Sequence, residues 1–200
     1  MNKFIILLLS ISFQTSILIA QDYQKEIQKH QEEMNQSFAN PEETPLTAED
    51  LKQFKGLDFF PIDEKFKVEA RYVRIKDSQP FKMKTSTDRL PVYTKYAEVF
   101  FKIDGKEFKL NVYQGESSKN SEAYKNFLFL PFTDASNGTE SYGGGRYIDL
   151  LIPEGDKIII DFNKAYNPSC TYNHKYSCPT PPQENDLDIK ILAGVKAYDH

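Results

Sequence analysis

The sequence contains no tryptophan, three histidines and two cysteines in 200 residues. One histidine, His200, is the last residue, where chain ends fray, so a metallohydrolase built on two or three histidines is not expected. Gly-x-Ser-x-Gly nucleophile motifs and dinucleotide-binding motifs are also missing, and the sequence indicates no cofactor. Basic residues are not in excess: 25 basic and 29 acidic side chains give a net charge of -4, which argues against nucleic-acid binding.

Long apolar runs are confined to the first twenty residues. Lys3 precedes an apolar stretch at 4–13, and a shorter stretch ends at Ala20, a small residue suited to signal peptidase. Polar residues at 14–16 interrupt the run, whereas a membrane-spanning helix needs about 20 mostly apolar residues. We therefore expect residues 1–20 to be a cleaved signal peptide. The mature chain would be exported to the periplasm or outside the cell, without a stable membrane anchor.

The rest of the chain is long enough for one well-filled core. Residues 21–46 are predicted to form an amphipathic helix and a linker, because four apolar residues recur at helical spacing: Tyr23, Ile27, Met34 and Phe38. A short second helix is expected between Thr47, an N-cap residue, and Gly56, a helix-ending residue. Residues 47–200 are expected to form a single β-rich domain.

Alternation of apolar and polar residues indicates strands through this domain. It is clearest at 66–72, and further extended segments are expected at 81–86, 90–103, 108–112, 127–132, 147–152, 157–162 and 187–191. Asp104-Gly105 predicts a tight hairpin because both turn positions favour positive φ, and residues 153–156 predict a second hairpin. The predicted fold class is all-β, an antiparallel sandwich or open barrel, with the two helices outside it.

The segment 133–185 differs from the rest, because it holds more than half of the nine glycines among polar and aromatic residues. Its run Gly143–Gly145 and Arg146 has two interpretations. Successive glycine N–H groups and a guanidinium can hold an anion. Alternatively, the glycines bend the chain against another backbone and Arg146 pairs with Asp149 or Asp134. A strand rather than a helix is expected to follow, which favours the bend.

The cysteines, Cys170 and Cys178, both lie in the part predicted to be exported. The favoured interpretation is a disulfide that closes a short loop and contributes roughly 2–3 kcal/mol. His174 lies midway between them, so Cys170, His174 and Cys178 are an alternative set of metal ligands, although their spacing does not match the usual zinc motifs and we predict no metal. A reactive thiol with His174 as its base is the third alternative.

Three motifs in this segment resemble the domain-of-unknown-function family DUF1684. They are Tyr142-Gly-Gly-Gly-Arg-Tyr147, Asp161-Phe-Asn-Lys-Ala-Tyr-Asn-Pro-Ser-Cys170 and Cys178-Pro-Thr-Pro-Pro-Gln-Glu-Asn185. The end of the chain at 191–196 is similar to the end of that family, although many members carry Glu where Val195 stands. The resemblance implies a β-rich single domain in a family with exported bacterial members and no established activity.

The leading functional hypothesis is a binding domain whose small-molecule ligand sits in a site formed by residues 134–185. Arg146 would hold an anionic group, tyrosines would flank an apolar or sugar-like part, and amides and Glu184 would fix orientation. The expected lining residues are Tyr142, Arg146, Tyr147, Asn163, Tyr166, Asn167, Glu184 and Asn185. The second hypothesis is a hydrolase with Glu184 or Asp161 as its acid–base group and Arg146 as its charge stabiliser. The third is a structural or interaction protein without a pocket.

Overall fold

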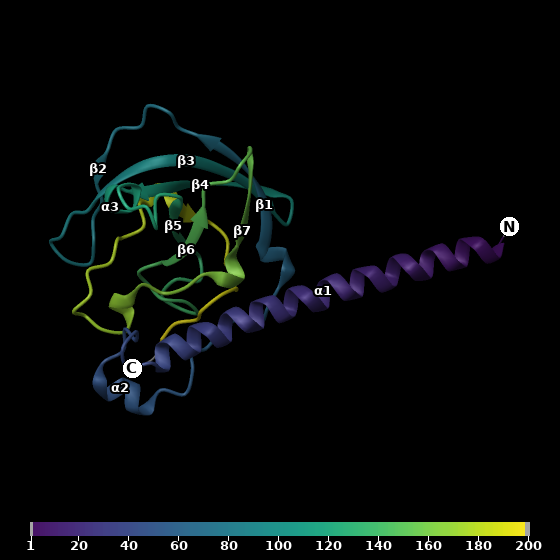
Figure 1. Ribbon diagram of the computed structural model, residues 1–200, viewed down its shortest axis with the longest axis horizontal. Coiled ribbons are helices and arrows are strands. Elements are labelled where there is room, and N and C mark those ends of the chain that lie inside the picture. The colour runs from purple at the N-terminus through teal and green to yellow at the C-terminus, as the bar shows by residue number, and fades with distance from the viewer. Residues whose placement is uncertain (1, 199–200) are drawn as a thin grey trace.

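The computed structural model describes the backbone of residues 2–198 and the side chains of residues 21–198. Its body is an eight-stranded sheet in the order β6-β5-β4-β3-β1-β7, with β2 paired to β3 and β8 paired to β5. The sheet curls into a half-barrel, and the long helix α1 (Asn2–Ala39) crosses its base and projects beyond it (Figure 1). The mostly antiparallel β fold with an N-terminal helix is confirmed.

The elements that follow α1 are mostly short strands and turns. The helices are α2 (Ala48–Gln53) and α3 (Glu116–Lys119), with 3-10 turns η1 (Glu64–Phe66), η2 (Phe162–Lys164), η3 (Ser169–Thr171) and η4 (Gln183–Asn185). The strands are β1 (Lys67–Arg74), β2 (Phe81–Lys82), β3 (Val92–Ile103), β4 (Lys106–Gly115), β5 (Phe127–Asp134), β6 (Arg146–Leu151), β7 (Lys157–Asp161) and β8 (Asp186–Leu187).

The alternating pattern of β1 and the turn at Asp104-Gly105 lie where the sequence predicts them. In β1, Val68, Ala70 and Tyr72 are buried while Lys67, Glu69 and Arg71 are exposed, as period-two alternation requires. Asp104 and Gly105 have φ values of 50° and 79°, and they join β3 to β4 with Ile103 opposite Lys106. The first hairpin is therefore confirmed.

One prediction about strand pairing and one about strand length are wrong. The turn at 153–156 does reverse the chain, but β7 pairs antiparallel with β1, where Val68 lies opposite Ile160, and not with β6. The last strand, predicted over 187–191, is the two-residue β8, and it pairs parallel with β5. Turn chemistry specifies a reversal of the chain, whereas the partner of each strand depends on which buried faces meet.

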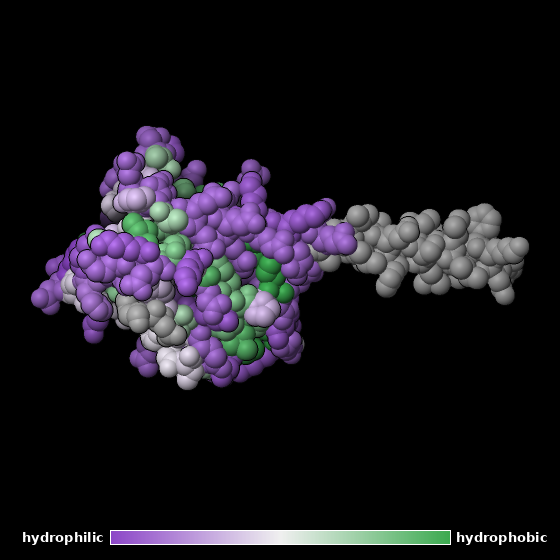
Figure 2. All heavy atoms as spheres, turned by 90° about the horizontal axis from the view of Figure 1, so that it is seen from below, coloured by the Kyte–Doolittle hydropathy of each residue, from purple (hydrophilic) through white to green (hydrophobic). Residues whose placement is uncertain are grey.

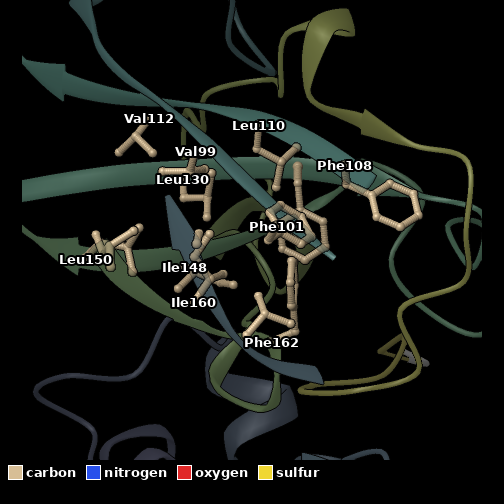
Figure 3. Packing of buried hydrophobic residues seen from close by; sticks show 14 of the residues in the cluster. Val99, Phe101, Phe108, Leu110, Val112, Leu130, Ile148, Leu150, Ile160 and Phe162 are labelled. Carbon is tan, nitrogen blue, oxygen red and sulfur yellow. The ribbon is translucent and has the colours of Figure 1, made fainter. Parts of the chain in front are cut away.

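Apolar side chains from the concave side of the sheet form one core (Figure 3). The labelled residues converge from β3, β4, β5, β6, β7 and η2: Val99, Phe101, Phe108, Leu110, Val112, Leu130, Ile148, Leu150, Ile160 and Phe162. A second, smaller cluster lies at the base of the barrel and consists of Leu46, Leu57, Tyr172 and Val195. Met34 and Phe38 of α1 pack on this second cluster, so the helix is part of the folded unit.

The described half of α1 is held by burial and by side-chain hydrogen bonds, one of which joins it to the loop that follows α2. Ile27 is fully buried, and Asn35 Oδ1 accepts a hydrogen bond of 2.8 Å from the Leu57 amide. The predicted signal peptide, residues 1–20, lies outside the residues whose side chains are described, and it stays a prediction. Within the described part of the chain, no helix combines the length and apolar character that a bilayer span requires. Polar residues cover most of the face shown in Figure 2, and apolar atoms form separate patches on it.

Candidate functional site

Arg146, the first residue of β6, is fully buried and bound by the protein itself. Its Nη2 donates to Asp134 Oδ2 at 2.8 Å and to the Ile191 carbonyl at 2.7 Å, and its Nη1 donates to the Ala193 carbonyl at 2.5 Å. The guanidinium thus fastens the C-terminal segment to the end of the barrel. This corrects the predicted role, because the guanidinium is fully buried and both Nη groups, which would hold an anionic ligand or stabilise charge in a hydrolase, are bonded to protein groups, while Nε is buried without a partner among the described residues.

The glycine run forms a bend and not an anion cradle. Gly145 has φ of +87°, and a Cβ there would come within 2.7 Å of the Phe132 carbonyl oxygen and 2.7 Å of Pro181 Cγ. Gly144 lies on the ring of Tyr142, where a Cβ would come within 2.4 Å of Cε1. The positive φ and the nearby backbone oxygen require glycine at 145, whereas a side chain at 144 would displace the Tyr142 ring.

Asn185 is fully buried and serves as a clamp between strands. Its Oδ1 accepts from the Asn111 amide at 2.8 Å, and its Nδ2 donates to the carbonyls of Asn111 at 2.8 Å and Pro131 at 2.6 Å. The strands β4 and β5 share one register pair, Tyr113 with Phe129, so this side chain satisfies backbone groups that the ladder leaves open. Asn185 is therefore a structural residue and not a ligand contact.

Glu184, next to this clamp, is half-exposed and binds protein groups. Its Oε1 lies 2.6 Å from Lys95 Nζ and accepts from the Tyr113 hydroxyl at 2.9 Å. The hydrogen bond from Lys95 lowers the pKa of Glu184. A general acid near neutral pH needs a raised pKa, so the electrostatics oppose the predicted acid role.

Asp161 and Asn163, at the junction of β7 and η2, hold α1. The Tyr23 hydroxyl donates to Asp161 Oδ1 at 3.0 Å, and Asn163 Nδ2 donates to the Tyr23 hydroxyl at 2.9 Å. Burial and the neighbouring Asp161 carboxylate raise the pKa of Tyr23. Asp161 and Glu184 thus belong to separate networks, and their contacts provide no paired-carboxylate site.

Tyr147 and Tyr166 belong to a row of aromatic rings on the other face of the sheet. The ring centroids of Tyr93 and Phe129 lie 5.7 Å apart, those of Phe129 and Tyr147 lie 4.7 Å apart, and those of Tyr147 and Tyr166 lie 5.8 Å apart. The Tyr147 hydroxyl donates to the Pro179 carbonyl, which fastens the segment after Cys178 over this row.

The Tyr166 hydroxyl donates to Asp149 Oδ1 at 3.0 Å. Asp149 reaches the surface beside Tyr93 and Phe129, in a shallow groove that these residues help to line. Loss of water around the carboxylate raises the pKa of Asp149. Asp149 was expected only as a partner for Arg146, and that pairing is replaced by the one with Asp134.

A pocket of about 270 Å³ lies between α1 and the segment 166–176, and it contains Tyr166 and Asn167 of the predicted set. It is bounded by Met34, Ser37, Phe38, Glu43, Pro45, Tyr166, Asn167, Ser169, Tyr172 and Tyr176. We call this the helix–tyrosine pocket. No sequence pattern indicated the contribution from α1, because the spacing of Met34 and Phe38 only predicted a face that packs against the domain.

Asn167 is the buried polar residue of this pocket. The residue is 3% exposed. Its Nδ2 donates to the Lys196 carbonyl at 2.8 Å and to the Tyr172 hydroxyl at 3.3 Å. Its Oδ1 is buried and has no hydrogen-bond partner among the described residues. A buried acceptor without a donor is costly, so Asn167 Oδ1 is an unused hydrogen-bonding group in the wall of this pocket.

Tyr142 and the two cysteines form a separate cluster. Cys170 and Cys178 approach to 3.5 Å without a bond between them, and both are buried. The Cys170 amide donates to Cys178 Sγ at 3.2 Å, and burial together with the neighbouring Cys170 raises the pKa of Tyr142. The expected disulfide is not formed in this structure, and for the oxidised protein it stays a prediction.

The alternative metal site of Cys170, His174 and Cys178 finds no support. Among the described residues there is no group of three or more His, Cys, Asp and Glu side chains arranged to hold a metal ion. Of the eight residues predicted to line one pocket, the structure brings Tyr166 and Asn167 to the helix–tyrosine pocket. The other six belong to the networks described above.

The comparisons with known proteins agree with this fold. The chain is similar to the uncharacterized protein from gene locus rrnAC0354 of Haloarcula marismortui, whose solution NMR structure matches with a TM-score of 0.67 and 32% identity over 88% of this chain and 95% of that chain. No curated protein matches the sequence. The family described as "Protein of unknown function (DUF1684)" matches residues 52–196. The chain therefore belongs to the DUF1684 family.

Proposed function

We propose that this protein binds a small molecule in the helix–tyrosine pocket. The observation that carries the proposal is the Asn167 Oδ1 atom, a buried acceptor without a partner in a residue that lines the pocket. A ligand with an N–H or O–H group would satisfy it and recover the free energy that the unpaired acceptor costs.

The other lining residues indicate the chemical class. Phe38, Tyr166, Tyr172 and Tyr176 present aromatic surface, which suits a ring or an alkyl ammonium group. Glu43 is the one charged side chain among the described lining residues, and it is acidic. We therefore expect a neutral or cationic ligand with a hydrogen-bond donor, and not the anionic ligand that Arg146 first suggested.

The size of the pocket limits the ligand. A volume of about 270 Å³ lies at the lower end of the range for small-molecule sites, about 300–1,000 Å³. One wall is the C-terminal half of α1 and the other is the segment that follows η2, so binding would also stabilise the docking of the helix. A compact aromatic amine matches this volume and this lining.

A matched pair of probes tests the proposal. We expect tyramine to bind and 4-hydroxyphenylacetate, which replaces the ammonium group by a carboxylate, to bind at least about tenfold more weakly in calorimetric titration. Asn167→Leu should abolish tyramine binding, because it removes the acceptor. Asn173→Leu, on the same segment but outside the pocket lining, is the matched control and should bind as the unmodified protein does.

Folding defects must be separated from binding defects, since Asn167 Nδ2 also bonds the Lys196 carbonyl. Tyr176→Leu reduces the aromatic wall without removing a side-chain hydrogen bond to the core, and it should weaken tyramine binding while the circular dichroism spectrum is unchanged. Equal affinity for both probes, or full affinity in Asn167→Leu, would contradict the proposal.

We also propose that the protein acts after export. A cut after Ala20 leaves Tyr23 and Ile27 on the mature chain, and both are buried against the domain. The docking of α1 and the helix–tyrosine pocket therefore depend only on residues beyond the proposed cut. Mass spectrometry of the protein from the exported fraction should find a chain that begins near Gln21, and a full-length chain in the cytoplasm would contradict it.

A further inference from the structure

We propose that the groove beside Asp149, on the face of the sheet opposite the core, binds a methylated ammonium cation such as a trimethylammonium group. The groove has a volume of about 300 Å³, and its lining includes Tyr93, Gly115, Tyr124, Phe127, Phe129 and Asp149. We call it the Asp149 groove. The inference does not depend on the helix–tyrosine pocket, which has a different lining.

The register of the sheet brings aromatic rings and a carboxylate together in this groove. Asp149 of β6 lies directly opposite Phe129 of β5, and Tyr93 of β3 lies directly opposite Gly115 of β4. Residues that are directly opposite in an antiparallel pair point to the same face of the sheet. The ring centroids of Tyr93 and Phe129 are 5.7 Å apart, although β4 lies between their strands.

Gly115 allows this approach of the two rings across β4. A Cβ at position 115 would meet Tyr93 Cε1 at 3.4 Å, so the Tyr93 ring lies across the glycine. A larger side chain at this position would stand in the space that the Tyr93 ring occupies. The absence of a side chain on β4 therefore leaves room for the ring and for the hollow beside it.

The rings of the groove are inclined to one another and are open to solvent. The planes of Tyr93 and Phe129 meet at 38°, and those of Tyr124 and Phe127 meet at 73° with their centroids 5.4 Å apart. Tyr124 and Phe127 are 55% and 39% exposed. Inclined rings form walls, as in the aromatic cages that bind quaternary ammonium groups, and not the single flat platform on which a sugar stacks.

Asp149 adds a negative charge that no basic side chain of the described residues neutralises. Its Oδ1 accepts a hydrogen bond of 3.0 Å from the Tyr166 hydroxyl, and no lysine or arginine of the described chain lies within ion-pair distance of the carboxylate. A carboxylate next to aromatic faces attracts a cation through both its own charge and the quadrupoles of the rings.

The basic residues of the adjoining segments are bound elsewhere. Arg89 influences Tyr93 electrostatically, but its guanidinium donates to the Ser177 carbonyl at 2.5 Å and to Ser177 Oγ at 3.1 Å. The nearby lysines pair with other acids: Lys95 with Glu184, Lys119 with Glu116, and Lys125 with Glu122. The charge that complements Asp149 is therefore expected from a ligand.

The lining also indicates what kind of cation fits. A primary ammonium group carries three N–H donors that need acceptors, and a mostly aromatic lining offers few. A fully methylated ammonium group has no N–H, and its methyl groups can lie against the ring faces while its charge remains near Asp149. The groove therefore suits a quaternary ammonium group better than a primary amine.

Tetramethylammonium is the probe, titrated into the full chain and followed by two-dimensional NMR. Asp149→Asn removes the charge and Tyr93→Leu removes one wall, so each should weaken binding at least about tenfold. Glu154→Gln, at an exposed acid in the turn after β6, and Phe100→Leu, on β3 outside the groove lining, are the matched controls and should bind as the unmodified protein does.

Two further measurements keep the test independent of variants that fold poorly. In the unmodified protein, the chemical-shift changes should concentrate at Phe127, Phe129 and Asp149. Choline should bind at least about tenfold more tightly than 3,3-dimethylbutan-1-ol, in which carbon replaces the charged nitrogen. Equal affinity for these two compounds, shift changes elsewhere, or full affinity in Asp149→Asn would overturn the proposal.

The test also separates this groove from the helix–tyrosine pocket. Tetramethylammonium has no donor for Asn167 Oδ1, so Asn167→Leu should leave its affinity unchanged, and a loss of affinity in that variant would overturn the proposal. Binding of a neutral methyl glycoside in the groove, with no binding of tetramethylammonium, would also overturn it and would identify a carbohydrate-binding surface.

Discussion

Replacement of Arg146 by Met should be among the most damaging single substitutions in the domain. Arg146 is fully buried, and its guanidinium pairs with Asp134 at 2.8 Å and donates to the carbonyls of Ile191 and Ala193. Removal of one member of a buried ion pair costs about 3–5 kcal/mol, because the other charge is left without a partner. Each carbonyl that loses its donor adds about 1–3 kcal/mol.

Together these losses amount to about 5 kcal/mol or more, which approaches the whole stability of a typical domain, about 5–15 kcal/mol. Arg146→Lys retains the charge but not the two Nη donors of the guanidinium, so it should lower the free energy of unfolding by less than Arg146→Met does. Urea denaturation followed by far-ultraviolet circular dichroism measures the change, and tyrosine emission is a second probe because the chain has no tryptophan.

Two comparisons make this prediction refutable. Arg71→Met is the matched control, since the Arg71 guanidinium lies at the surface 4.2 Å from the centroid of the Phe100 ring, an interaction worth about 0.5–1 kcal/mol. The double variant Arg146→Met with Asp134→Asn should lose less than the sum of the single losses, because the unpaired charge is gone. A loss below about 1 kcal/mol in Arg146→Met, or strict additivity in the double variant, would refute the reasoning.

Two further predictions concern the glycine run and the aromatic row. Gly145→Ala should destabilise the fold by roughly 1–3 kcal/mol, because position 145 has positive φ and meets a backbone oxygen at 2.7 Å. Gly143→Ala should be tolerated, since its Cβ would meet ordinary contacts at 3.6 Å and beyond; equal melting temperatures for the two variants would contradict this. Burial raises the pKa of Asp149 in the folded state above its value in the unfolded chain. The protonated carboxyl therefore favours folding at acid pH, and this contribution to the free energy of unfolding is lost as pH rises through the folded-state pKa. Asp149→Asn should therefore raise the melting temperature at pH 7 and leave it unchanged near pH 3, and a fall at pH 7 would show that the Tyr166 hydrogen bond outweighs the cost of the buried charge.

Much of the secondary structure was predictable because its causes are local. Thr47 caps α2 by accepting from the Asp50 amide at 3.1 Å, as the spacing of the two residues indicated. Asp104 and Gly105 turn the chain with positive φ, which is a property of those two residues. The turn at 153–156 is equally local, but it says nothing about the partner of β7, and the predicted pairing with β6 was wrong.

The candidate site was harder to predict because its residues serve different neighbours. The motifs correctly marked 133–185 as unusual, yet the reason is mostly structural: Arg146 and Asn185 satisfy backbone groups that the short strand pairings leave open. Side-chain type alone cannot distinguish an arginine that is available to a ligand from one that is bound to carbonyls 45 and 47 residues away in the sequence. The helix–tyrosine pocket was missed because one of its walls is α1.

The sequence by itself determined the family, the β-rich class, the N-terminal helix and the tight turn at Asp104-Gly105, since each depends on short-range patterns or on contiguous motifs. Only the tertiary structure decided that Arg146 pairs with Asp134 and not Asp149, and that Tyr23 of α1 anchors to Asp161. These contacts join segments through a shared interior, where burial raises the energetic cost of every unpaired polar group and so selects one partner among several that the sequence allows.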